Sequence, residues 1–133
     1  MHTNWPARIL CPVDFSEPSA AALRHAGAFQ RLAGGSLTVL HAHSWQAPAY
    51  FTESQLAELK RQFDESLAAA GGALQEFIAR VCPECEAARR IADARPVEGI
   101  LAAAEETGAD LLVLGTHGRS GWDRFLQIGR AHV

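Results

Sequence analysis

The stretch that most constrains the fold is residues 111–121, where the apolar run Leu-Leu-Val-Leu ends abruptly in Gly-Thr-His-Gly-Arg-Ser-Gly. Four consecutive apolar residues are typical of a parallel strand that is covered on both faces. The glycines that follow allow backbone N–H groups to come close to an anion. The stretch therefore predicts a buried strand that ends in a loop suited to phosphate.

The sequence before this stretch alternates between strand-like and helix-like segments. Short connections between successive strand–helix units favour right-handed crossovers, which place helices on both faces of a parallel sheet. We therefore predict a single α/β domain with a doubly wound parallel sheet. The strand that is poorest in bulky apolar residues, at 87–92, is expected at an edge. The predicted strands are 8–13, 36–43, 87–92 and 111–114, and the predicted helices are 18–33, 53–81 and one from Pro96 to Gly108.

Composition and charge argue against several broad functions. The chain has 133 residues, of which 48% are hydrophobic, and this fits one globular domain. A net charge of -3 with scattered Lys and Arg disfavours nucleic-acid binding. No apolar run approaches the roughly 18 residues that span a bilayer, and the start lacks the features of a signal peptide. We expect a cytoplasmic protein without a nucleic-acid or membrane partner.

Three predicted strands end at segments that could bind a ligand together. Ligands of open α/β sheets bind outside the carboxyl ends of the strands, where the strand order reverses. Residues 12–14, 42–43 and 115–118 converge at that edge. The carboxylate of Asp14 could accept a hydrogen bond from adenine or ribose, and the glycine loop could donate N–H groups to phosphates. The alternative interpretation of Asp14 is an ordinary turn or cap residue.

Three segments of the sequence resemble the universal stress protein family. They are Arg-Ile-Leu-Cys-Pro-Val-Asp-Phe-Ser at 8–16, Leu-Thr-Val-Leu-His-Ala at 37–42 and Asp-Leu-Leu-Val-Leu-Gly-Thr-His-Gly-Arg-Ser-Gly at 110–121. The resemblance implies an adenine-nucleotide α-hydrolase-like fold with strand order 3-2-1-4-5. It also implies a regulatory protein that binds ATP or a related adenine nucleotide, with at most slow hydrolysis, and it leaves the need for magnesium open.

The resemblance also assigns roles to particular residues. Asp14 and the backbone around Val13 and Ala42 would hold adenine and ribose, while the glycine loop would lie along the phosphates, mainly through main-chain groups. No catalytic or metal-binding residue is assigned. The candidate binding residues are Pro12, Val13, Asp14, Ala42, Leu114, Gly115, Thr116, His117, Gly118 and Arg119.

The end of the sequence departs from the family pattern. In nucleotide-binding members, nine residues follow the second glycine of the motif, and then come a glycine and a hydroxyl residue. Here the nine residues after Gly118 end at Gln127, and Ile128 and Gly129 stand in those two positions. The final helix and the fifth strand, which commonly forms the family's homodimer contact, are also missing. We expect a truncated domain at 1–127 with strand order 3-2-1-4. Residues 128–133 resemble a translated sequencing adaptor and are expected to be a non-native tail.

Several other interpretations remain open at this stage. Cys82-x-x-Cys85 could be a redox pair or half of a zinc site, although incidental thiols are favoured because three cysteines give no paired framework and agree with a reducing compartment. His41 and His43 point the same way along a strand, which fits packing better than metal binding. The rival functions are an interaction module of the same fold that binds no nucleotide, and an adenylating enzyme.

Overall fold

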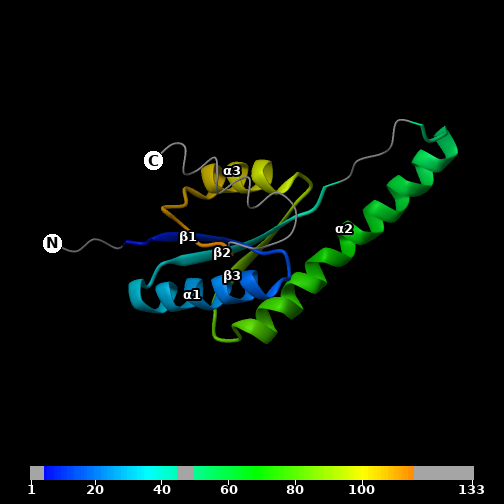
Figure 1. Cartoon of the computed structure of the whole chain (residues 1–133). Coiled ribbons are helices and arrows are strands. Elements are labelled where there is room, and N and C mark those ends of the chain that lie inside the picture. Colours follow the sequence, from blue (N-terminus) through cyan, green and yellow to red (C-terminus); the bar gives the residue numbers. More distant parts are fainter. Residues whose placement is uncertain (1–4, 45–49, 116–133) are drawn as a thin grey trace.

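A computed structural model of the chain describes residues 5–44 and 50–115, and the statements below refer to these residues. Four parallel strands form one sheet in the order β3-β2-β1-β4, with helices on both faces (Figure 1). This confirms the predicted fold class and strand order. The strands are β1 (Arg8–Pro12), β2 (Ser36–Ala42), β3 (Ala87–Ala92) and β4 (Leu111–Leu112), and the helices are α1 (Glu17–Ala33), α2 (Glu53–Val81) and α3 (Pro96–Thr107).

The strand at the glycine loop is shorter than predicted. β4 ends at Leu112, although the N–H of Val113 still donates to the carbonyl of Leu10 at 3.0 Å. The four apolar residues alternate between the two faces, as a strand covered on both sides requires. Leu111 and Val113 pack against one core cluster, and Leu112 and Leu114 against the other. The predicted edge position of β3 is confirmed.

Local capping signals set the ends of the first two helices. The Ser16 side chain accepts a hydrogen bond from the N–H of Ser19 and caps α1, which Gly34 ends in a left-handed conformation. α2 begins with a capping box, in which Thr52 and Gln55 satisfy each other's backbone N–H groups. These contacts lie within a few residues of one another, and they account for the close agreement with the predicted bounds.

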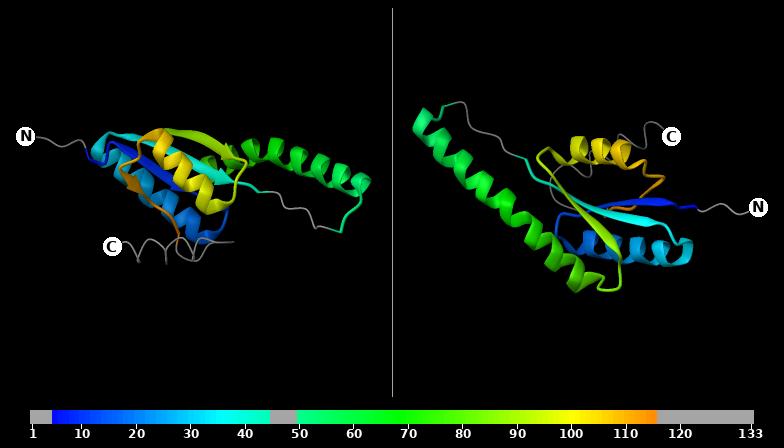
Figure 2. Two further views of the ribbon diagram at one scale, coloured as in Figure 1. Left: turned by 90° about the horizontal axis from the view of Figure 1, so that it is seen from above. Right: turned by 180° about the vertical axis from the view of Figure 1, so that it is seen from behind.

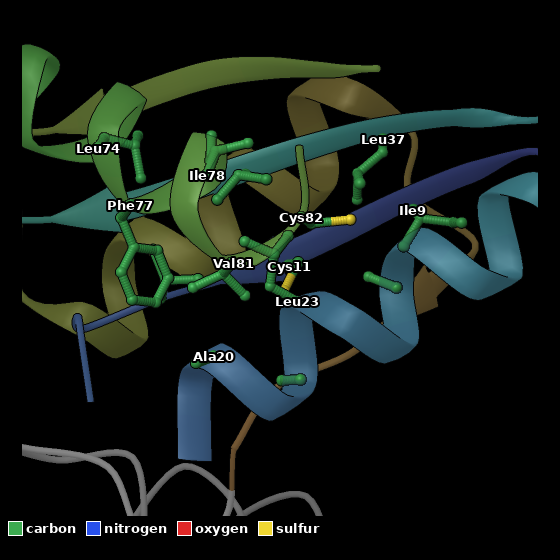
Figure 3. Close-up of a cluster of buried hydrophobic side chains, with 14 residues drawn as sticks. Ile9, Cys11, Ala20, Leu23, Leu37, Leu74, Phe77, Ile78, Val81 and Cys82 are labelled. Atoms are coloured by element: carbon green, nitrogen blue, oxygen red, sulfur yellow. The ribbon is translucent and has the colours of Figure 1, made fainter. Parts of the chain in front are cut away.

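The core is divided between the two faces of the sheet. The view from behind in Figure 2 shows α1 and α3 on opposite faces. The larger cluster joins α1 and the second half of α2 to the sheet. Figure 3 shows its buried side chains. The cluster includes Cys11, which is fully buried, and burial raises the pKa of this thiol to about 12. The smaller cluster, under α3, contains Leu10, Leu40, Ile100 and Ala103.

The first half of α2 extends beyond the sheet (Figure 1). Leu56 and Leu59 in the first half are therefore only half-buried, whereas Leu74 and Phe77 in the second half lie in the core. Burial along this helix follows contact with the sheet as well as helical periodicity. Among the described residues, no helix is long and apolar enough to cross a membrane.

The two cysteines that follow α2 are joined in a disulfide, Cys82–Cys85. The prediction that they are incidental thiols is therefore wrong. A turn through Pro83 and Glu84 brings them together, and the N–H of Cys85 donates to the carbonyl of Cys82 at 3.0 Å. A bonded pair of sulfurs offers no thiolate, so this state also excludes the zinc interpretation.

The side chain of Asp110 ties the start of β4 to the start of β1. Its two carboxylate oxygens accept hydrogen bonds from the N–H groups of Ala7 and Arg8, each at 3.0 Å. These bonds favour the charged form and hold the pKa of Asp110 below its usual value of 3.8. A lowered folded-state pKa stabilises the fold above the unfolded-state pKa, and the contribution is lost as the pH falls through the folded-state pKa.

Asp110→Asn is therefore expected to lower the urea midpoint near neutral pH. The amide has one acceptor oxygen where the carboxylate has two, and it carries no charge. The difference from the wild type should shrink when unfolding is repeated at progressively lower pH, as the wild-type carboxylate takes up a proton. Asp93→Asn, at an exposed position after β3, is the control and should leave the midpoint unchanged. A constant difference at all pH values would contradict this assignment.

Candidate functional site

A cavity of about 330 Å³ opens at the carboxyl ends of β1 and β2. Its wall is formed by residues 12–15 at the end of β1, residues 40–44 at the end of β2, and Pro96 and Ile100 of α3. Parallel strands present their carboxyl ends at one edge of the sheet, so these separate segments meet there. The volume lies at the lower end of the range that small-molecule sites occupy.

Backbone hydrogen bonds fix the floor of the cavity. The N–H of Val13 donates to the carbonyl of Leu40 at 2.8 Å and extends the pairing of β1 with β2 by one residue. The carbonyl of Val13 lies 3.0 Å from Nδ1 of His41, which can donate to it in the matching tautomer. A carbonyl oxygen has two lone pairs, so this contact still leaves acceptor capacity. The floor is thus rigid before any ligand arrives.

Asp14 is buried in the cavity wall, where it is bonded to the start of α1. Its Oδ1 accepts from the N–H of Ser16 at 3.1 Å and from the Ser16 hydroxyl, and its own N–H donates to Oγ of Ser19 at 3.3 Å. Asp14 therefore does stabilise the turn before α1, as its alternative interpretation held. The same contacts position its carboxylate at the cavity, so the turn and a binding role are compatible.

Aromatic rings form the side of the cavity that faces α2. Phe15 has a φ of 65°, which is uncommon for a residue with a side chain, and its ring lies 4.5 Å from that of His41 and 5.4 Å from that of Phe77. Next along the wall, His43 stacks on Phe63 at 5.2 Å. Contacts on both sides hold the Phe15 ring, and they compensate for its backbone conformation.

His41 of β2 and His43, just after that strand, point to the same side, as predicted, with ring centroids 5.8 Å apart. Burial is the main cause that lowers the pKa of His41, because it disfavours the charged imidazolium. His41 therefore presents a neutral ring to the cavity near neutral pH. His43 lies 3.1 Å from Oγ of Ser66 on α2. Within residues 5–44 and 50–115, no group of three potential metal ligands lies together.

The beginning of the glycine loop packs tightly against the rest of the domain. Leu114 contacts the core cluster that contains Leu40 and Ile100, two residues of the cavity wall. Gly115 is buried, and a Cβ added there would lie 2.7–2.8 Å from backbone and Cβ atoms of Pro18 in α1. Close packing against α1 therefore requires glycine at this position. The remaining candidates, Thr116, His117, Gly118 and Arg119, lie outside the described residues.

The structure brings four of the ten predicted site residues to the cavity: Pro12, Val13, Asp14 and Ala42. The wall residues that sequence analysis did not select fall into two groups. Phe15, Leu40, His41 and Ser44 are close in sequence to the predicted residues, so a wider window around each strand end would have included them; His43 belongs to the segment 42–43 that was expected at this edge, although it is not among the ten candidates. Pro96 and Ile100 had no sequence signal, because their place depends on how α3 packs over β2.

Comparison with known proteins gives a consistent result. The family model described as the universal stress protein family matches residues 7–130. The structure of universal stress protein UspA from Lactobacillus plantarum is 27% identical, with a TM-score of 0.68 over 86% of this chain and 79% of that chain. A universal stress protein family member from Burkholderia pseudomallei is 25% identical, with a TM-score of 0.57 over 93% and 90%.

A third solved structure is a universal stress protein in complex with cAMP. It is 18% identical to this chain and has a TM-score of 0.60, over 93% of this chain and 90% of that chain, so the likeness concerns the fold. The comparison with curated protein sequences finds no match.

Proposed function

Because this chain belongs to the universal stress protein family, we propose that it acts in the stress response as a regulatory protein that binds ATP or a related adenine nucleotide. The observation that carries the proposal is the cavity at the carboxyl ends of β1 and β2. Doubly wound sheets bind ligands at this edge. Pro12, Val13, Asp14 and Ala42 all line it.

In this proposal, adenine and ribose occupy the cavity. Asp14 accepts a hydrogen bond from an amino or hydroxyl group, and the neutral ring of His41 contributes a polar but uncharged surface. The phosphates extend toward the loop that begins at Leu114 and Gly115, where backbone N–H groups of residues 115–119 receive them. Apart from Asp14, His41 and the aromatic wall, the proposed contacts are made by main-chain groups.

The cAMP complex supports the class of ligand. That universal stress protein has this fold and holds an adenine nucleotide. The binding experiment therefore compares ATP, ADP and cAMP, each with and without magnesium.

Isothermal titration of the full chain with ATP tests the proposal. Asp14→Asn is expected to weaken binding about tenfold or more, because hydrogen bonds to a charged acceptor are roughly twice as strong as those to a neutral one. Asparagine keeps an oxygen that can accept from Ser16, so the turn is preserved. Asp93→Asn is the matched control: it also follows a strand at the carboxyl edge but does not line the cavity.

Gly118→Val tests the phosphate half of the site separately. This variant is expected to weaken the binding of ATP more than the binding of adenosine, because the added side chain obstructs the approach of the phosphates to the backbone. If the folded wild-type chain gives no heat with any adenine nucleotide, the nucleotide proposal fails. The interaction module of the same fold would then be the better account.

A further inference from the structure

The bonded pair Cys82–Cys85 lies at the turn between α2 and β3 and does not line the cavity. We propose that this pair is a reversible thiol–disulfide site, which exchanges electrons with small thiols and disulfides of the glutathione class. The site is independent of nucleotide binding. Four features of its surroundings support this assignment.

The first feature is a turn that holds the cysteines together in either redox state. The N–H of Cys85 donates to the carbonyl of Cys82 at 3.0 Å, and Pro83 occupies the second turn position, where its fixed φ is favourable. The two Cα atoms lie 5.4 Å apart, within the range that disulfides require. This backbone bond does not involve sulfur, so the two thiols remain close after reduction and can pair again.

The second feature is the attachment of the turn to α1 by contacts that do not involve sulfur. Nε2 of Gln30 donates to the carbonyl of Glu86 at 2.7 Å, and Oε1 of Gln30 accepts from the N–H of Glu86 at 3.3 Å. Arg31 forms an ion pair with Glu84 at 3.1 Å. These contacts keep the segment in place when the disulfide opens, so reduction need not unfold the domain.

The third feature is a space on α1 that fits the joined sulfurs. A Cβ at Gly27 would lie 2.6 Å from Sγ of Cys82 and 2.7 Å from Sγ of Cys85. Glycine is a poor helix former, and here it lies in the middle of α1. The disulfide explains why glycine stands here, because a residue with a side chain would collide with both sulfurs.

The fourth feature is the unequal exposure of the sulfurs. Cys82 is 1% exposed and lies among the core side chains of Figure 3, whereas Cys85 is half-buried. A small thiolate therefore reaches Cys85 first. Sγ of Cys82 lies 3.4 Å from Oε1 of Glu84, so the reduced thiol has a carboxylate acceptor. The third cysteine, Cys11, is buried and does not compete.

The exchange is balanced in atoms and electrons. A glutathione thiolate attacks Sγ of Cys85, the bond to Sγ of Cys82 breaks, and the leaving Cys82 thiolate takes a proton. A second glutathione thiolate attacks the glutathione sulfur of the mixed disulfide and releases Cys85, which is also protonated. The protein gains two electrons and two protons, and two glutathione molecules become one glutathione disulfide. The reverse sequence oxidises the pair.

Equilibration of the full chain in glutathione buffers tests the proposal. The ratio of reduced to oxidised glutathione is varied, thiols are trapped by alkylation, and each cysteine is assigned by mass spectrometry. We expect Cys82 and Cys85 to convert together and reversibly, with unchanged circular dichroism, while Cys11 stays unmodified until denaturation. A pair that stays reduced at every ratio, or that opens only when the domain unfolds, would overturn the proposal.

Gly27→Ala and Gly71→Ala form a matched pair of variants. A Cβ at Gly71 would have no atom within 4 Å, so this variant should leave the midpoint ratio unchanged. Gly27→Ala should shift the midpoint about tenfold or more toward the dithiol, because overpacking is destabilising and separated sulfurs can turn away from the new methyl group. Equal midpoints in the two variants would contradict the role of Gly27.

Two variants that each lack one cysteine of the pair test the order of attack without any added bulk, and both retain the buried Cys11. Cys82→Ser leaves Cys85, which should form a mixed disulfide with oxidised glutathione. Cys85→Ser leaves Cys82, which should resist modification in the folded chain because it is buried. The opposite pattern would overturn the assignment of Cys85 as the reactive sulfur.

Discussion

Replacing Leu23 by alanine is expected to lower the free energy of unfolding by about 2–5 kcal/mol. The Leu23 side chain is 0% exposed and belongs to the cluster that joins α1 and α2 to the sheet (Figure 3). Alanine removes the buried carbon atoms and leaves a cavity, because the surrounding helices and strands relax only partly. Urea unfolding followed by circular dichroism measures the loss.

Leu32→Ala provides the control on the same helix. Leu32 is 86% exposed, so the same truncation should change the free energy of unfolding by no more than about 0.5 kcal/mol. The comparison holds residue type and helix constant and varies only burial. Similar losses in both variants would mean that the orientation of α1 against the sheet is wrong.

The second large effect is expected for Gly115→Ala, which should destabilise the domain by about 1–3 kcal/mol. The added Cβ would lie 2.7–2.8 Å from the carbonyl carbon, carbonyl oxygen and Cβ of Pro18. A flexible side chain could rotate away, but these backbone and ring atoms cannot. To remove this steric overlap, the glycine loop and the start of α1 must move apart. Because Asp14 is bonded to that part of α1, nucleotide affinity should fall as well.

Gly72→Ala on α2 is the control, and it is expected to raise the free energy of unfolding. No atom would lie within 4 Å of the added Cβ, and alanine favours a helix over glycine by up to about 1 kcal/mol. Chemical unfolding of both variants measures the two effects. If Gly115→Ala also stabilised the chain, the close contact with Pro18 would be refuted.

The sequence predicted most element boundaries because local contacts set them. Ser16 and Thr52 satisfy backbone N–H groups within three residues, and Gly34 and Gly108 end α1 and α3 with left-handed backbone. β4 was the exception. Its length depends on how long it stays beside β1, and periodicity carries no information about that contact.

The candidate site was predictable only in part. Asp14 and its neighbours could be placed from the rule that ligands bind at the carboxyl ends of parallel strands, and the structure puts them in the cavity wall. The disulfide could not be chosen over free thiols, because Cys-x-x-Cys spacing fits several chemistries. The decisive feature is the space at Gly27, which lies on another helix.

By itself, the sequence determined the order of strands and helices along the chain and the class of sheet that they form. These follow from hydrophobic periodicity, capping and glycine placement, which act over a few residues. Only the tertiary structure decided which side chains close the cavity, which half of α2 is buried, and that Gly27 and Gly115 make room for partners. Those outcomes depend on contacts between segments far apart in the chain, and no local pattern records them.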